Sequence, residues 1–159
     1  MRHLKWALVA AVIFAVPMTA QAGFVIEGSL GTGYAVTEPT GRIPTSIMIA
    51  PGYGLGEMLR LELGFNFALG DVEHGDFDMQ LRPMLVLDPP LFPMYLRAQM
   101  AVANLIADAP TVTAFGGALG VSFSLGGLGV FAEAGVMPFF YELDTVWTIE
   151  GRLGVYYAM

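Results

Sequence analysis

The stretch Leu59–Leu69 alternates without a break between large apolar residues and small or polar ones. Its apolar positions are Leu59, Leu61, Leu63, Phe65, Phe67 and Leu69, and the positions between them are Arg60, Glu62, Gly64, Asn66 and Ala68. Successive side chains of a β-strand point to opposite faces, whereas a helix would scatter these leucines around its axis. The stretch is therefore predicted to be a strand with one apolar and one polar face.

The same two-residue period recurs along the rest of the chain. Seven further segments follow it: 24–34, 47–55, 77–87, 94–102, 115–125, 130–140 and 147–159. Each segment has about the ten residues with which a tilted strand crosses a bilayer. Short connections (56–58, 88–93 and 126–127) alternate with longer ones (35–45, 70–76, 104–113 and 142–146). This alternation is typical of a membrane barrel with short turns on one side and long loops on the other.

Three residues fit the strand pattern less well. Pro51 and Pro83 fall inside predicted strands, and each lacks the backbone N–H that a sheet uses for its ladder of hydrogen bonds. We therefore expect a β-bulge or a strand end at both prolines. Asn104 falls on the apolar phase of its segment, which indicates that the strand ends before it.

The composition of the polar faces separates a membrane barrel from a soluble one. The chain is 55% hydrophobic and 13% charged, and its polar faces consist mostly of Gly, Ala and Ser. Such small residues suit a narrow barrel interior, whereas bulky Leu, Phe and Ile suit a band in contact with lipid. The sequence thus predicts an all-β fold, a closed eight-stranded antiparallel up-and-down transmembrane β-barrel. The alternative is a soluble periplasmic carrier resembling a lipocalin, with its apolar face pointing inward.

Residues 23–159 resemble the small eight-stranded outer-membrane β-barrels, the family of the OmpA transmembrane domain and OmpX. The last six residues resemble the C-terminal signal read by the outer-membrane barrel assembly machinery, through Gly154, Tyr157 and Met159. That signal usually ends in an aromatic residue, where this chain has Met159. The resemblance implies a monomer in the outer membrane of a Gram-negative bacterium, with membrane lipid and, transiently, the assembly machinery as partners.

Residues 1–22 have the features of a cleavable secretory signal peptide. Basic residues at the start precede the apolar run 6–16, and Ala20-Gln21-Ala22 offers small residues at the two positions that a signal peptidase needs. The apolar run is shorter than the roughly 20 residues of a membrane-spanning helix. The barrel domain is accordingly expected to comprise residues 23–159.

The polar faces bring nine charged residues to the predicted lumen: Glu27, Arg60, Glu62, Asp78, Arg82, Arg97, Glu133, Glu150 and Arg152. Because an isolated charge in a narrow lumen is costly, we expect cross-strand ion pairs among them. Gln80, Gln99 and Tyr156 are the expected hydrogen-bonding partners.

Two interpretations of this predicted lumen remain open. The favoured one is a polar, side-chain-filled core in a protein with a structural or surface role. Phe131, Met137 and Phe139 lie on the same inward phase and favour a plugged lumen over an open pore. The alternative is a narrow channel for ions, water or small solutes, gated by the internal Arg–Glu pairs.

Catalysis and cofactor binding receive little support. Ser46, His74 and Asp76 are the one combination that offers a nucleophile, a base and an orienting acid, so a lipid A-modifying enzyme remains an alternative to the expected non-enzymatic protein. Asp71, Glu73, His74 and Asp76 lack the fixed ligand spacing of a calcium loop, and we expect neither a metal nor a cofactor. Nucleic acid is not an expected partner either, because 14 acidic residues outnumber seven basic ones.

Overall fold

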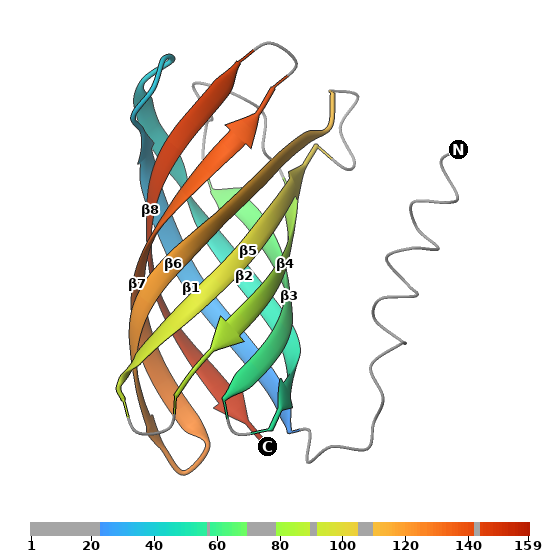
Figure 1. Cartoon of the computed structure of the whole chain (residues 1–159), viewed down its shortest axis with the longest axis vertical. Coiled ribbons are helices and arrows are strands. Elements are labelled where there is room, and N and C mark those ends of the chain that lie inside the picture. Colours follow the sequence, from blue (N-terminus) through green and yellow to red (C-terminus); the bar gives the residue numbers. More distant parts are fainter. Residues whose placement is uncertain (1–22, 57, 70–78, 90–91, 105–109, 142–143) are drawn as a thin grey trace, which may run out of the picture.

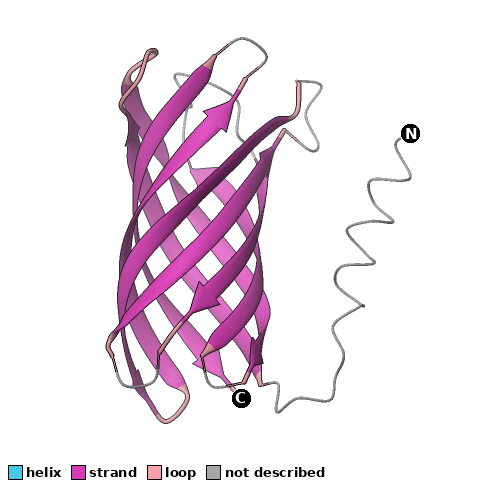
Figure 2. Ribbon diagram, viewed as in Figure 1, coloured by secondary structure: helices cyan, strands magenta, loops and turns pink. Residues whose placement is uncertain are grey.

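The computed structural model describes residues 23–56, 58–69, 79–89, 92–104, 110–141 and 144–159. The elements are the strands β1 (Phe24–Ala35), β2 (Gly41–Leu55), β3 (Leu59–Leu69), β4 (Met79–Leu87), β5 (Met94–Ala103), β6 (Val112–Leu125), β7 (Leu128–Phe140) and β8 (Thr145–Ala158). Each strand pairs with the next, and β8 pairs with β1, so that the sheet closes into a barrel (Figures 1 and 2). The described residues contain no helix of the length and hydrophobicity needed to cross a membrane.

The closing pair of strands is matched along its whole length. β1 and β8 pair from Val25 opposite Ala158 to Ala35 opposite Thr148. Because every strand has two neighbours, the sheet has no edge with a row of unpaired N–H and C=O groups. The last residues of β2, β4 and β6 and the C-terminus lie at one end of the barrel, called the turn end below, and the other end is called the loop end (Figure 1).

The strand predictions agree best with the structure where the alternation is strongest. β3 spans the predicted residues, and β5 ends at Ala103, before Asn104 with its positive φ of 58°. β2 begins at Gly41 instead of residue 47, so the predicted long loop 35–45 is shorter than expected. The added residues of β2 lack apolar alternation and are held by pairing with β1. Residues 77 and 78, predicted to start the fourth strand, lie outside the described residues.

The prediction of a bulge or strand end at Pro51 and Pro83 is wrong. Pro51 pairs with Ile26 of β1 and Pro83 pairs with Leu63 of β3, and neither register shifts. On the other side of each proline, the ladder omits two pairs and resumes in the same register. A strand residue directs its N–H toward only one neighbouring strand. Each proline therefore removes a hydrogen bond on one side and leaves the strand continuous.

A bulge occurs instead where β1 passes from Gly31 to Gly33. There, Thr32 faces two residues of β2, Pro44 and Thr45, and the register shifts by one. Bulges are among the few places in a sheet that tolerate proline, because a bulged residue need not donate to the ladder. The proline that disturbs the register is thus Pro44, within a segment that the sequence pattern assigned to a loop.

The buried face of the sheet is polar and the outer face is apolar. Arg97 is 2% exposed and Glu27 is 1% exposed, whereas Leu153 on the outer face is 67% exposed. Large aromatic residues lie exposed toward both ends, with aliphatic residues between them: Tyr34, Phe67, Phe115, Phe140 and Trp147 toward the loop end, and Tyr53, Phe123 and Tyr157 toward the turn end. This is the predicted orientation, and it contradicts the alternative of a soluble carrier with an apolar lumen.

Candidate functional site

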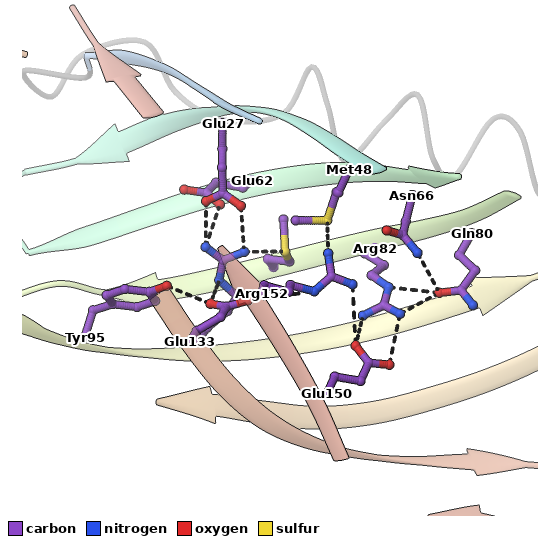
Figure 3. A network of polar contacts seen from close by, with 12 residues as sticks. Glu27, Met48, Glu62, Asn66, Gln80, Arg82, Tyr95, Glu133, Glu150 and Arg152 are labelled. Atoms are coloured by element: carbon purple, nitrogen blue, oxygen red, sulfur yellow. Dashed lines mark hydrogen bonds and ion pairs between the residues drawn. The ribbon is translucent and has the colours of Figure 1, made fainter. Parts of the chain in front are cut away.

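The candidate site is the set of charged side chains in the lumen. We call it the lumen network and define it as Glu27, Arg60, Glu62, Arg82, Arg97, Glu133, Glu150 and Arg152. These are eight of the nine predicted lumen residues, and Asp78 lies outside the described residues. They come from six strands, β1, β3, β4, β5, β7 and β8, and each stands at an inward position of the two-residue alternation. The structure brings all eight into the barrel interior. Figure 3 labels six of them: Glu27, Glu62, Arg82, Glu133, Glu150 and Arg152.

Arg97 stands at the centre of the acid-rich half of this network. Its Nη1 and Nη2 donate to the two carboxylate oxygens of Glu27 at 3.1 and 2.6 Å. Its Nε lies 3.2 Å from Glu133 Oε2, and its Nη2 lies 3.8 Å from Glu62 Oε2. One guanidinium group is thus surrounded by three carboxylates. The Tyr95 hydroxyl donates to Glu133 at 2.7 Å and supplies a further favourable contact to that carboxylate.

Arg82 and Glu150 form the second centre, nearer the loop end. Arg82 donates to both carboxylate oxygens of Glu150, at 2.7 and 3.1 Å, in a bidentate pair. It also donates to Gln80 Oε1 from Nε at 2.9 Å and from Nη2 at 2.7 Å. Gln80 is therefore a hydrogen-bonding partner of the network, as expected. Arg152 contacts Glu150 less closely, with Nη2 at 3.4 Å from Oε2.

Arg60 extends the network toward the turn end. Its Nε lies 3.1 Å from Glu62 Oε1, and its Nη1 donates to Asp88 Oδ2 at 2.9 Å. Tyr156, expected as a hydrogen-bonding partner, instead places its ring 5.1 Å from the Arg60 guanidinium in a cation–π contact. The oxygen of Gln99 has no hydrogen-bond partner within the described ranges, so its expected role is not seen.

Aromatic side chains close the lumen at the turn end. Tyr95, Phe131 and Tyr156 pack together with Val25 and Val86 in one buried cluster. Each of the three rings lies against a glycine of a neighbouring strand: Tyr95 against Gly120, Phe131 against Gly154, and Tyr156 against Gly129. A Cβ at any of these glycines would collide with the ring. We call Tyr95, Phe131 and Tyr156 the aromatic plug.

The loop end is filled on one side and hollow on the other. Met137 and Phe139, both predicted to point inward, pack with small residues of β5 and β6 in a second apolar cluster. Beside it, a cavity of about 440 Å³ reaches down to Gln80 and Glu150. Tyr141 also lines this cavity, and partial burial raises the pKa of its hydroxyl above the usual value. The lumen therefore contains open space toward the loop end and packed rings toward the turn end.

Some partners in the network were missed by the sequence interpretation. Asp88 and Asn66 lie on the polar phases of their segments, so the alternation itself contained the signal for both. The thioethers of Met48 and Met84 accept contacts from Arg152 and Arg97 at 3.1 and 3.2 Å. Methionine on an inward position is an ordinary feature of a packed core, so nothing in the sequence distinguished these two residues.

The remaining predicted residues fall in several places. Ser46 is buried at the wall of the lumen, whereas His74 and Asp76 lie outside the described residues, as do Asp71 and Glu73. Among the residues that are described, no three His, Cys, Asp or Glu side chains are grouped so as to hold a metal ion. Of the C-terminal signal residues, Gly154 packs beneath Phe131, and Tyr157 and Met159 are exposed at the turn end.

A closed barrel of eight antiparallel strands, polar inside and apolar outside, is the architecture of the small outer-membrane β-barrels. Within that class the chain resembles Neisserial surface protein A (NspA), with a TM-score of 0.67 and 16% identity over 86% of this chain and 97% of that chain. It also resembles the N-terminal β-barrel domain of Pseudomonas aeruginosa OprF, with a TM-score of 0.52 and 18% identity over 88% and 98% of the two chains. A de novo designed transmembrane β-barrel matches with a TM-score of 0.50 and 10% identity, over 86% of this chain and 95% of the design. No protein-family model and no curated protein sequence matches the chain.

Proposed function

We propose that the protein is a non-enzymatic integral barrel of the bacterial outer membrane, with a structural or surface role and a lumen filled by side chains. The observation that carries this proposal is the inverted distribution of residues on a closed sheet, with Leu153 exposed and Arg97 buried. Contiguous exposed leucines and valines would be an aggregation hazard in water, whereas they match the interior of a bilayer. Closure of the sheet also satisfies the backbone where no water is present.

The contents of the lumen support a structural role over a channel. An ion path needs continuous polar space between the two ends of the barrel. The aromatic plug occupies the turn end, and Arg97, held by three carboxylates, lies across the middle. Opening a path would require several buried ion pairs and packed rings to move together. Breaking one buried ion pair costs about 3–5 kcal/mol.

Targeting and assembly form part of the same proposal. Residues 1–22 lie outside the described residues, and we assign them the role of a secretory signal peptide on their sequence. We assign Gly154, Tyr157 and Met159 to recognition by the barrel assembly machinery, and membrane lipid to the outer face of a monomeric barrel. The exposure of Tyr157 and Met159 at the turn end supports a role in recognition.

Conductance across a planar lipid bilayer tests the filled lumen. We expect no resolvable current steps from the wild-type protein. Tyr156→Ala removes one ring of the aromatic plug and is expected to produce small steps, whereas Tyr34→Ala removes a tyrosine side chain from the outer face and serves as the control. Stable wild-type conductance that changes with Arg82→Met would favour the gated channel and overturn the filled lumen.

Behaviour without detergent tests the membrane assignment separately. The outer face described above is expected to make the purified barrel aggregate when detergent is removed, and to keep it monodisperse in detergent micelles or lipid nanodiscs. Size-exclusion chromatography with light scattering measures both states. A monodisperse protein in plain buffer would contradict the assignment to a membrane.

A further inference from the structure

The half of the lumen network nearer the loop end contains more positive than negative charge. Arg82 and Arg152 share one close carboxylate, Glu150. The next nearest carboxylate, Glu133, places Oε1, which has no hydrogen-bond partner among the described residues, 3.9 Å from Arg152 Nε, while its Oε2 lies 3.2 Å from Arg97 Nε and accepts the Tyr95 hydroxyl. Arg82 and Arg152 therefore share Glu150 fully and Glu133 only in part, because Glu133 is also paired with Arg97.

Of the two arginines, Arg152 has the poorer hydrogen-bond partners. Its side chain is 3% exposed, and its Nε has no hydrogen-bond partner in the described structure. Its contact from Nη2 to Glu150 is long at 3.4 Å, and its Nη1 faces the thioether of Met48, which is a weak acceptor. Arg82, in contrast, has a full set of close partners in Glu150 and Gln80. A buried guanidinium group with unused donors is costly, so a further acceptor beside Arg152 would stabilise it.

A small cavity lies where that acceptor is needed. Its volume is about 30 Å³, and its wall includes Arg82, Arg152, Ser46 and Asn66. Gly31 borders it as well, and a Cβ there would stand 3.0 Å from Arg152 Cγ and 3.5 Å from Ser46 Oγ. The volume matches one water molecule or one monatomic ion and is too small for phosphate or a carboxylate ligand.

The small cavity adjoins the larger cavity at the loop end. The larger cavity of about 440 Å³ shares Ile43, Pro44, Gln80 and Glu150 with the small one. The shared lining residues place the small cavity on the loop-end side of the lumen, away from the aromatic plug. Polyatomic solutes are stopped at the larger cavity by size alone.

We propose that the small cavity binds a monatomic anion, chloride under ordinary conditions, held by Arg152 and the Ser46 hydroxyl beside the positive charge of Arg82. Water can accept the unused hydrogen bonds without bringing any charge, whereas a halide accepts the same hydrogen bonds and also places a negative charge beside the two guanidinium groups. Glu150 also borders the cavity, but both of its oxygens accept hydrogen bonds from Arg82, which offsets its repulsion of an anion. We call this site the anion cavity.

Anomalous scattering from bromide tests the proposal directly. Crystals of the detergent-solubilised barrel, grown with bromide in place of chloride, are expected to show one anomalous peak between Arg152 and Ser46. The Ser46→Ala variant loses one hydrogen bond to the ion, so we expect bromide to bind roughly 10-fold more weakly. Ser29→Ala is the matched control, because Ser29 is another buried lumen-facing serine and does not border the cavity.

Thermal unfolding provides a second readout that needs no crystals. At constant ionic strength, replacing methanesulfonate, which is too large for the cavity, by chloride is expected to raise the unfolding midpoint of the wild type and of Ser29→Ala. The rise is expected to be smaller for Ser46→Ala. Arg152→Met is expected to abolish the chloride-dependent rise. If that variant does not fold, the comparison of Ser46→Ala with Ser29→Ala still tests the site.

Two results would overturn the anion cavity. One is a water molecule in the cavity with no bromide signal. The other is a bromide peak or a chloride-dependent midpoint that is the same in Ser46→Ala as in the wild type. Neither result bears on the outer-membrane proposal, which rests on the outer face of the barrel.

Discussion

Arg97 of β5 and Glu27 of β1 form a bidentate ion pair that spans the barrel, with Nη2 2.6 Å from Oε2 and Nη1 3.1 Å from Oε1. β1 and β5 stand four strands apart in the closed ring and share no backbone hydrogen bond. Both side chains are almost completely buried, at 0% and 1% exposure. The pair therefore links opposite walls of the barrel and blocks the lumen between them.

Removing one partner of this pair is expected to destabilise the barrel strongly. Arg97→Met leaves Glu27, Glu62 and Glu133 without their shared guanidinium group, and an unpaired buried charge costs about 3–5 kcal/mol. Urea-induced unfolding in phospholipid vesicles, followed by tryptophan fluorescence, measures the loss. The double variant Arg97→Met/Glu27→Gln removes one of the three charges and is expected to recover part of the loss. A single-variant effect below about 1 kcal/mol would contradict the burial of this pair.

The hydroxyl of Tyr95 is expected to contribute to stability through Glu133 alone. Tyr95→Phe keeps the ring of the aromatic plug and removes the 2.7 Å hydrogen bond to the carboxylate. Hydrogen bonds to charged groups contribute about 1.5–3 kcal/mol, and a loss in that range is expected. Tyr157→Phe makes the same change on the outer face, where the side chain is 45% exposed, and is expected to cost little. Equal losses in the two variants would argue against the buried hydrogen bond.

The glycines beneath the aromatic plug are expected to tolerate no side chain. Gly129→Ala places a Cβ against the Tyr156 ring, and overpacking of this kind costs about 1–3 kcal/mol. Gly28→Ala is the matched control, because nothing lies within 4 Å of the Cβ that it adds. The free energy of unfolding of the two variants separates a steric effect from a general effect of alanine in a strand. If Gly28→Ala destabilised the barrel as much as Gly129→Ala, the packing of Tyr156 on Gly129 would be disproved.

The turn between β6 and β7 is expected to depend on backbone conformation. Gly126 and Gly127 have φ values of 60° and 88°, as in the two-residue hairpin turns that favour Asn-Gly. Gly126→Asn is therefore expected to leave stability nearly unchanged. Gly126→Val puts a β-branched residue in the left-handed region and is expected to cost about 1–2 kcal/mol. Refolding yields and unfolding curves for this pair check the turn, and a neutral valine would rule out the assigned conformation.

The sequence was most informative where a single physical rule determines the structure. Strict alternation in Leu59–Leu69 predicted β3, its inward Arg60 and Glu62 and its outward leucines, because a strand offers only two faces. The same rule placed Arg97 and Glu27 in the lumen. It did not predict which charges pair, because pairing across the ring depends on strand stagger, which period-two alternation does not encode.

The failures of prediction also have physical causes. Pro51 and Pro83 each remove a donor on one side of a strand, and pairing on the other side keeps the register. The first residues of β2 have no apolar alternation and are held by β1, so a local pattern could not identify them. The aromatic plug required knowing that Tyr156 crosses over Gly129, a contact that only the closed sheet creates.

Paramagnetic broadening of methyl signals tests the central claim, that leucines contact lipid and charges lie inside. Leucine and valine methyl groups are labelled in the protein in nanodiscs whose acyl chains carry a spin label. We expect strong broadening for Leu153 and Leu96, which are 67% and 55% exposed, and little for Val86 and Val25, which face the lumen at 0% and 3%. Broadening of Val86 with sharp signals from Leu153, or no broadening at any of the four, would contradict the orientation of the barrel.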